Sequence, residues 1–220
     1  MNNVIAIDSH APAPEAIGQL AACLSAGGAA VIPTDSVYGI ACAATPGNPG
    51  HERIFAIKHR ERTQTLPLLV PGPEALEQLA AQPVPLAATA LARAFWPGAL
   101  TLVVRASAAI PPEYVAADGT VALRAPAAPV ALAAMRELGT PLACTSANLH
   151  GQPAATSVAE LAPSVVAEAD LTLDGGPAPI GVASTIVDCT GDVPRILRAG
   201  AVDEHAIGEV LHGTGANRRN

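Results

Sequence analysis

The chain has 220 residues and a mass of 22.0 kDa, enough for one large domain or two small ones whose core needs neither disulfides nor metals. Half of the residues are apolar and 14% are charged, which excludes intrinsic disorder, because ample apolar surface is available to offset the entropy lost on folding. Aromatic residues make up 2% and the net charge is -7, so neither base stacking nor broad binding to a nucleic-acid backbone is favoured.

Proline and glycine divide the sequence into short segments in which helical and strand patterns alternate. This alternation predicts an α/β or α+β fold, and since no linker-like stretch occurs we expect one domain over 1–220, with a core of about 14–211 and a flexible tail over 213–220. In chain order, the patterns predict a helix over 14–26, a strand over 29–34, a helix over 51–59, a strand over 66–70, helices over 73–81 and 85–95, strands over 100–106 and 120–124, a helix over 130–138, a strand over 142–147, a weaker helix over 157–169 interrupted near Pro163, a strand and turn over 171–176, paired strands over 184–189 and 195–199, and a helix over 203–211.

The cysteines and the N-terminus indicate where the protein works. The four cysteines are widely spaced and form no CxxC pair, so the sequence predicts buried thiols in a reducing compartment and neither a zinc site nor a disulfide framework. The first ten residues lack the basic and apolar regions of a signal peptide, and the most apolar window is interrupted by Arg93 and Pro97. We therefore expect a cytoplasmic protein that does not associate with membranes.

Several common catalytic motifs are absent from the sequence. It contains no GxxxxGK[ST] loop, no GxGxxG after a strand, no HExxH pair and no GxSxG elbow. These absences exclude the two common glycine-rich phosphate cradles and the usual metalloprotease and esterase sites.

Polar side chains gather where predicted strands begin or end. Three clusters stand out: Thr34, Asp35, Ser36 and Tyr38 after AAVIP, Thr145, Ser146 and Asn148 after PLAC, and Ser184 with Thr185 before IVDC. A single such cluster is more often made of turn or cap residues. Three of them favour a site for a polar ligand, because ligands of open α/β sheets collect near strand ends.

Basic residues in an acidic chain are the next candidates. Lys58, Arg60 and Arg62 form the densest basic run, which suits a triphosphate or a carboxylate but equally a solvated helix end. Arg124 closes an apolar strand, so its charge needs either an anionic ligand or an internal Asp or Glu. Arg198 poses the same choice.

Seven ordered blocks of sequence, spanning about 14–211, resemble the YrdC/Sua5 family of threonylcarbamoyl-AMP synthases. The blocks are AAVIPTDSVYGIAC, RIFAIKHRERTQTLPLLV, FWPGALTLVV, TVALRAP, PLACTSANLHGQPAAT, GGPAPIGVASTIVD and RILRAGAV. The resemblance is to the short, single-domain form. It implies an open, twisted mixed sheet flanked by helices around a large concave cavity.

The resemblance also implies the reaction and its participants. L-threonine, bicarbonate and ATP, with Mg²⁺ accompanying the ATP and no metal held tightly by the protein, would give threonylcarbamoyl-AMP and pyrophosphate for the t6A modification of tRNA. A threonylcarbamoyl transferase machinery would take the product, and direct binding of tRNA would be weak. The rival readings are a carbamoyl-adenylate-forming, carbamoyltransferase-like paralogue and a non-catalytic RNA-binding or regulatory module.

The family's functional residues fall on named positions of this sequence. Its K-x-R and S-x-N motifs, to which the resemblance assigns catalysis and ATP binding, correspond to Lys58, Arg60, Ser146 and Asn148. The resemblance adds Thr120 and Arg198 to the ATP contacts and assigns threonine to Thr34, Arg124 and Ser184. The sequence departs from the family's usual residues at Glu61, Thr65, Ala154 and Ala183, which points to altered substrate or reduced activity as the alternative.

Overall fold

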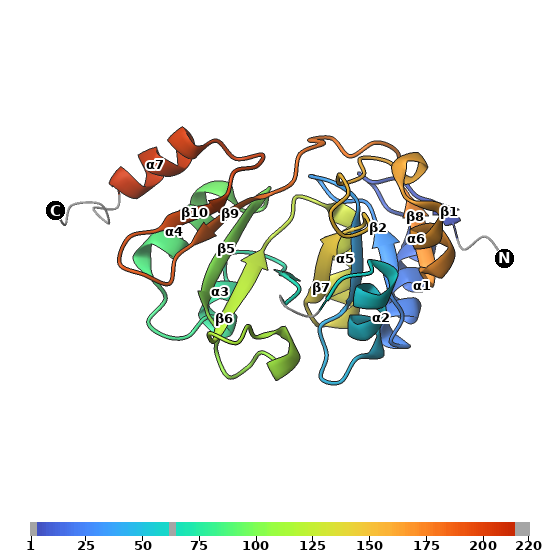
Figure 1. The fold of residues 1–220 in the computed structure, drawn as a ribbon, viewed down its shortest axis with the longest axis horizontal. Coiled ribbons are helices and arrows are strands. Elements are labelled where there is room, and N and C mark those ends of the chain that lie inside the picture. Colours follow the sequence, from blue (N-terminus) through green and yellow to red (C-terminus); the bar gives the residue numbers. More distant parts are fainter. Residues whose placement is uncertain (1–3, 62–64, 214–220) are drawn as a thin grey trace.

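The computed structural model describes residues 4–61 and 65–213, and the strands among them form one mixed sheet (Figure 1). The order across the sheet is β1-β8-β2-β3-β7-β4-β6-β5-β9-β10. The strands are β1 (Val4–Ala6), β2 (Ala30–Ile32), β3 (Gly39–Ala43), β4 (Leu68–Leu69), β5 (Leu100–Arg105), β6 (Thr120–Arg124), β7 (Leu142–Ser146), β8 (Leu171–Asp174), β9 (Thr185–Asp188) and β10 (Arg195–Arg198). The helices are α1 (Pro14–Ser25), α2 (Pro49–Ile57), α3 (Ala75–Leu79), α4 (Leu86–Phe95), α5 (Pro129–Leu138), α6 (Pro163–Glu168) and α7 (Glu204–Gly213), with short 3₁₀ turns at Pro112–Tyr114 and Val158–Glu160.

Proline and glycine residues mark the ends of helices in this structure. α1 and α5 both begin at a proline, whose missing N–H costs nothing in the first turn of a helix. α5 ends at Gly139, which adopts a left-handed conformation with φ of 66°. The apolar stripes of these two helices then pack on each other and on the sheet.

Alternate residues along each strand build two separate cores, one on each face of the sheet. The first core joins α2, α3, α4, α6 and α7 to the strands from β2 to β10 in the sheet order, leaving out β1 and β8. The second core joins α1 and α5 to β2, β3, β4, β7 and β8, and it includes no residue from β5, β6, β9 or β10. Within the described residues, one face of β5, β6, β9 and β10 is therefore not covered by a helix.

The fold class and most predicted elements are confirmed. The sheet is mixed and open, helices cover it, and β9 and β10 pair antiparallel as expected. The weak helix over 157–169 is confined to a 3₁₀ turn and to α6, which begins at Pro163. Residues 214–220 of the predicted tail lie outside the described residues. No helix in the described parts of the chain is long and apolar enough to cross a membrane.

Two strands were missed by the sequence analysis. β3 reads GIACA, in which glycine and alanine have low strand propensity and every residue is buried, so the sequence shows no alternation. β1 has only three residues and lies at the edge of the sheet, paired with β8. β3 lies between β2 and β7, and its first residue, Gly39, lies next to the candidate site.

A candidate active site between the two halves of the sheet

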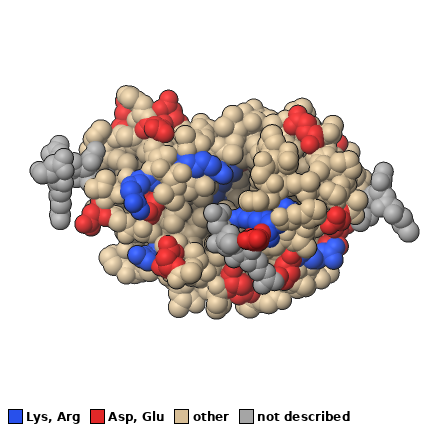
Figure 2. All heavy atoms as spheres, viewed as in Figure 1, with Lys and Arg blue, Asp and Glu red and all other residues tan. Residues whose placement is uncertain are grey.

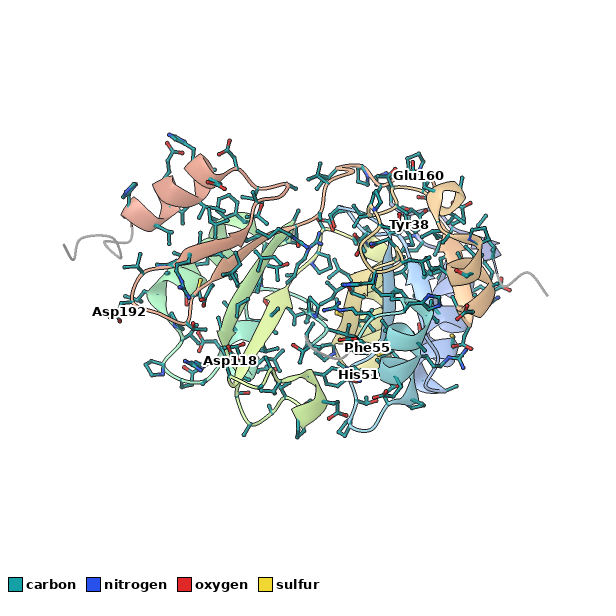
Figure 3. The ribbon with its side chains drawn as sticks, viewed as in Figure 1. Tyr38, His51, Phe55, Asp118, Glu160 and Asp192 are labelled. Carbon is teal, nitrogen blue, oxygen red and sulfur yellow. The ribbon has the colours of Figure 1, made fainter. Side chains whose placement is uncertain are left out.

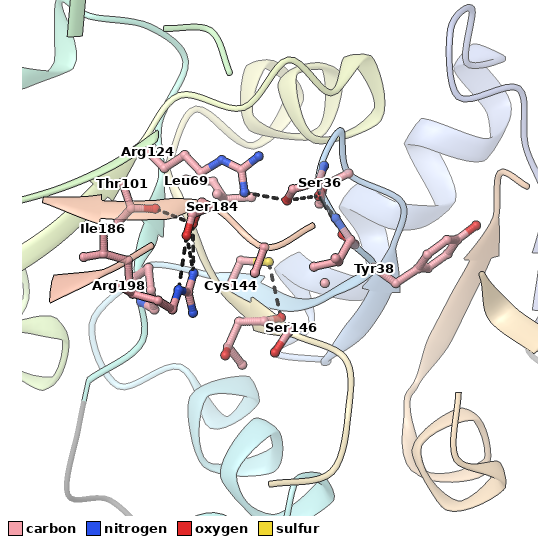
Figure 4. A pocket seen from close by; sticks show the side chains of 16 residues that line it. Ser36, Tyr38, Leu69, Thr101, Arg124, Cys144, Ser146, Ser184, Ile186 and Arg198 are labelled. Carbon is pink, nitrogen blue, oxygen red and sulfur yellow. Dashed lines mark hydrogen bonds between the residues drawn. The ribbon is translucent and has the colours of Figure 1, made fainter. Parts of the chain in front are cut away.

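The register of the sheet places side chains from distant segments on one face. Leu69 of β4 is paired with Arg124 of β6, and Thr101 of β5 is paired with Ile186 of β9. All four line a cavity of about 110 Å³ that lies over the short strand β4 (Figure 4). The other lining residues are Thr34, Ser36, Val37, Tyr38, Gly39, Pro67, Cys144, Thr145, Ser146, Ala183, Ser184 and Arg198. We call this space the central pocket.

Arg124 lies at the carboxyl end of β6 and is held by three protein groups. Its Nε donates to the Gly98 carbonyl at 2.9 Å and its Nη1 to Ser36 Oγ at 2.8 Å. Nη2 forms an ion pair with Asp35 Oδ1 at 2.5 Å. Arg124 and Asp35 are 7% and 5% exposed. The sequence left two alternatives for Arg124, a ligand or an internal acid, and in the structure it contacts an internal acid while also lining the pocket.

Ser184, which directly precedes β9, and Arg198, the last residue of β10, line the same pocket. The Arg198 guanidinium donates through Nε and one Nη to the Ser184 carbonyl, at 3.1 and 2.7 Å, and the same Nη contacts Ser184 Oγ at 3.1 Å. Ser184 Oγ in turn lies 2.8 Å from Thr101 Oγ1. The pKa of Arg198 is lowered first by burial and then by the positive charge of Arg124. Two guanidinium groups that disfavour each other therefore line one hollow, which an anion would stabilise.

Thr34 belongs to the turn between β2 and β3. Its hydroxyl donates to the Val37 carbonyl at 2.6 Å and lies 3.2 Å from Ser36 Oγ. These contacts are the local turn bonds that the sequence analysis set against a functional role. Thr34 nevertheless lines the central pocket, as does Ser146 at the carboxyl end of β7. The structure thus brings five predicted site residues to one cavity: Thr34, Arg124, Ser146, Ser184 and Arg198.

Lys58 caps the end of α2 and is 3% exposed. Its ammonium bonds the backbone carbonyls of Ser146 and Asn148, while its own carbonyl accepts from His150 N at 2.9 Å. Burial, followed by the charge of Arg60, lowers the pKa of Lys58 from 10.5 to about 8. Lys58 therefore lies beneath the 146–148 segment and does not line the central pocket.

Asn148 opens onto a second and larger cavity. This cavity has a volume of about 460 Å³ and its lining is Asn148, Leu149, Gln152, Pro153, Ala154, Ala155, Glu160 and Ala162. Asn148 Nδ2 donates to the Leu149 and Gln152 carbonyls, at 2.9 and 2.6 Å, whereas its buried Oδ1 has no hydrogen-bond partner among the described residues. Ser146 and Asn148, two residues apart, thus border two adjacent cavities.

Arg60 and Thr120 line neither cavity. The Arg60 guanidinium lies over the Phe55 ring, 5.7 Å from its centroid, and burial lowers its pKa. Thr120 is the first residue of β6, at the opposite end of the strand from Arg124, and its hydroxyl donates to Asp118 Oδ1 at 2.7 Å. Figure 3 shows Asp118 at the end of the sheet far from Tyr38, which lines the central pocket. Arg62 lies outside the described residues.

The sequence assigned no role to Thr101, Cys144 and Ile186, which line the central pocket, or to Asp35, which lies behind it. Thr101, Cys144 and Ile186 lie within strands whose composition is ordinary for a core, so nothing in the sequence separates them from packing residues. Asp35 belongs to a polar cluster that the analysis did list, yet its pairing with Arg124 joins residues 89 positions apart. Only the topology reveals that contact.

All four cysteines are free, and burial raises the pKa of Cys144 to about 12, so this thiol stays protonated and unreactive. Within residues 4–61 and 65–213, no group of three or more His, Cys, Asp or Glu residues is placed to hold a metal ion.

The sequence around this site matches a known protein family. A family model covering Sua5, YciO and YrdC proteins, described as "Telomere recombination", matches residues 22–200. The chain belongs to the Sua5/YciO/YrdC family. Its polar hollow between the two halves of the sheet is therefore the candidate active site of a Sua5/YciO/YrdC domain.

Two curated relatives are named as threonylcarbamoyl-AMP synthases, one of them as putative. The chain is 37% identical over 196 residues to threonylcarbamoyl-AMP synthase of Bacillus subtilis, which covers 89% of this chain and 56% of that protein. It is 39% identical over 188 residues to a putative threonylcarbamoyl-AMP synthase of Mycobacterium tuberculosis, covering 86% of this chain and 85% of that protein. The chain thus spans little more than half of the first relative and most of the second.

Solved Sua5/YciO/YrdC structures share the fold. A structure of Pyrococcus abyssi Sua5 complexed with L-threonine superposes with a TM-score of 0.88 at 34% identity, covering 94% of this chain and 60% of that one. Escherichia coli YciO superposes with a TM-score of 0.80 at 26% identity, covering 92% of this chain and 98% of that one.

Proposed function

We propose that this chain is an L-threonylcarbamoyladenylate synthase, a nucleotidyltransferase that converts L-threonine, bicarbonate and ATP into threonylcarbamoyl-AMP, pyrophosphate and water. The observation that carries the proposal is the convergence of Arg124 and Arg198 with the hydroxyls of Thr34 and Ser184 in one cavity of an acidic chain. Figure 2 shows basic side chains on both sides of a hollow near the middle of this face. The family membership supports the same reading.

Threonine fits the central pocket in size and chemistry. Three N–H groups of Arg124 contact protein atoms, which leaves one N–H on each terminal nitrogen for an end-on carboxylate. Thr34 and Ser184 supply hydroxyls for the polar atoms of the amino acid, and the apolar side chains of Leu69 and Ile186 can face its methyl group. In this arrangement the substrate carboxylate binds Arg124 and offsets the repulsion between Arg124 and Arg198 across the cavity.

ATP would lie along the 146–148 segment, between the central pocket and the larger cavity bordered by Asn148. Lys58 has one N–H left after bonding the two carbonyls of that segment, and Arg198 reaches the same region from the other half of the sheet. Arg60 and Thr120 contribute to ATP binding only if the nucleotide or the segment around Arg60 moves toward them. Ala183 lines the central pocket and Ala154 the larger cavity, and neither side chain has a hydroxyl. The affinity for ATP therefore depends more on the other polar side chains of the two cavities.

The chemistry requires alignment and charge neutralisation more than a protein nucleophile. The threonine amine and bicarbonate condense to an N-carboxylate with loss of water. An oxygen of that carboxylate then attacks the α-phosphorus, a new P–O bond forms, and the bond between the α-phosphorus and the bridging oxygen breaks to release pyrophosphate. Arg198 and Lys58 stabilise the charge that accumulates on the phosphates. Mg²⁺ enters with the ATP phosphates as part of the substrate, because Mg²⁺ at such sites is held largely by phosphate oxygens.

A direct assay tests the proposal. The purified chain is incubated with ATP, bicarbonate, Mg²⁺ and labelled threonine, and we expect pyrophosphate release coupled to a labelled threonylcarbamoyl nucleotide. Omitting threonine or bicarbonate should stop pyrophosphate release. Turnover with carbamoyl phosphate and ATP in the absence of threonine would instead assign the carbamoyl-adenylate reaction, and failure of both reactions would refute the enzymatic reading.

The cellular setting is part of the same proposal. The product would pass to a threonylcarbamoyl transferase machinery in the cytoplasm for t6A modification of tRNA, with little direct binding of tRNA by this chain. The net charge of -7 supports weak binding, because phosphate-backbone affinity depends on many cationic contacts. A gel shift with tRNA at increasing salt measures that affinity.

A further inference from the structure

We propose that Asp35 is a positioning residue, which aims the Arg124 guanidinium at the carboxylate of the amino-acid substrate and so sets the selectivity for amino acids over amino alcohols. This role rests on the proposed function. Asp35 itself does not line the central pocket, so it acts through Arg124 and not by touching the substrate.

Three protein acceptors hold the Arg124 guanidinium. Gly98 accepts from Nε, Ser36 from one terminal nitrogen, and Asp35 from the other. Each of the three acceptors fixes a different nitrogen, so the plane and the direction of the fork are both determined. The Asp35 contact, at 2.5 Å, is the shortest of the three and the only one to a charged group. Its loss would free Nη2 to rotate toward other acceptors.

Burial makes this contact costly to lose. Both side chains are over nine-tenths buried, and a buried charge without its partner is strongly unfavourable. Asp35 lies on the far side of the ion pair, where it lines a separate cavity of about 80 Å³ with Pro33, Pro129 and Gly175. The pair therefore forms part of the wall between that cavity and the central pocket, with Arg124 toward the substrate and Asp35 behind it.

The position of Asp35 in the chain supports a positioning role. It follows Thr34 directly and precedes Ser36, and both of these neighbours line the pocket. The backbone carbonyl of Asp35 also accepts from Ile180 N at 3.1 Å, which ties this turn to the loop between β8 and β9 that carries Ser184. One turn thus orients Arg124 and anchors the loop that delivers the opposing hydroxyl.

The test compares L-threonine with L-threoninol, which has an alcohol in place of the carboxylate. Binding of each to the ATP-loaded protein is measured by calorimetry, together with the Michaelis constants for threonine and ATP. In Asp35→Asn we expect the threonine KM to rise at least about tenfold and the ATP KM to stay within about threefold, since a hydrogen bond to a charged group is being weakened. The preference for threonine over threoninol should fall by a similar factor, whereas general damage to the pocket would weaken both ligands alike.

Two further variants complete the experiment. Asp188→Asn is the matched control, because Asp188 is also buried and paired with an arginine, Arg195, at 2.9 Å, yet it lies outside the central pocket. We expect wild-type discrimination in this variant. Asp35→Glu keeps the charge but lengthens the side chain, so its discrimination should fall between wild type and Asp35→Asn. It becomes the deciding variant if Asp35→Asn does not fold.

The outcomes separate this inference from the proposed function. An active wild type whose Asp35 variants keep the wild-type preference for threonine over threoninol overturns the role of Asp35 alone. A wild type that neither binds nor turns over threonine overturns the proposed function and this inference with it.

Discussion

The strands β2, β3 and β7 contribute to the cores on both faces of the sheet, whereas β6, β5, β9 and β10 pack against helices on one face. The difference arises because, among the described residues, α1 and α5 are the helices that pack on the second face, and the core they form reaches no further than β4, a strand of two residues. In Figure 1 the two groups of strands lie on opposite sides of the molecule, with the doubly covered group carrying α1, α2, α5 and α6.

The face of β5, β6 and β9 that no described helix covers is where polar side chains gather in this fold. On the uncovered face, positions that would otherwise point into a core are occupied by Arg124, Thr101 and Ile186, and they line the central pocket. The doubly covered half contributes rigid strand ends, at Ser146 and near Thr34, to the same pocket. The Arg124 charge therefore comes from one half of the sheet, and Asp35 and Ser36 of the other half hold it in place.

The largest effect is expected from Arg124→Ala. Removing the guanidinium should raise the threonine KM about 100-fold or more, because truncating one partner of a buried charge pair costs about 2–5 kcal/mol, while the ATP KM should change by no more than about threefold. The variant also leaves Asp35 buried without its cation, so we expect a lower unfolding midpoint. Steady-state kinetics and thermal denaturation measure both. An unchanged threonine KM would show that the uncovered face does not hold the amino acid.

A core truncation in the doubly covered half should give the opposite pattern. Leu24 of α1 is fully buried in the second core, so Leu24→Ala should lower the free energy of unfolding by about 2–5 kcal/mol while the folded fraction keeps the wild-type threonine KM. Leu197→Ala is the control, because Leu197 is 57% exposed on β10 and should change stability by no more than about 0.5 kcal/mol. Urea titration reports the stabilities. A raised threonine KM in Leu24→Ala would mean that the two halves do not divide their roles in this way.

The sequence predicted elements better than contacts. Helices such as α4 and α5 have apolar stripes and clear ends, so local rules suffice for them. β3 escaped because GIACA is buried on both faces and lacks strand-forming residues. For the site, the polar clusters, Arg124 and Arg198 were identified from residue type and position, whereas the resemblance gave them roles and added Thr120. The Asp35–Arg124 pair and the placement of Lys58 under two carbonyls depend on register across the whole sheet, which no local pattern encodes.

The smallest effect concerns Lys58, which lies beneath the junction of the two halves. Its pKa is about 8 in the folded protein against an ordinary 10.5, so the ammonium that faces the 146–148 segment loses its proton as the pH rises through about 8. The affinity for ATP should then fall about tenfold from pH about 7 to about 9, because one cation is lost from the phosphate site. Calorimetric titration with ATP across this range measures the effect. Lys58→Arg should flatten the profile, since a guanidinium stays charged.

Stability should move in the opposite direction over a higher pH window. Between about 8 and 10.5 the unfolded chain keeps the Lys58 proton that the folded chain has lost, so the unfolded state binds more protons and the contribution of Lys58 to folding stability rises with pH. The difference in unfolding free energy between the wild type and Lys58→Met, followed across this window, isolates that contribution from other titrating groups. The ATP affinity could stay level past pH about 9 while this stability difference still changes. That result would show that Lys58 titrates as expected but does not contact the nucleotide. Phosphate binding would then fall to Arg198 on the opposite half of the sheet.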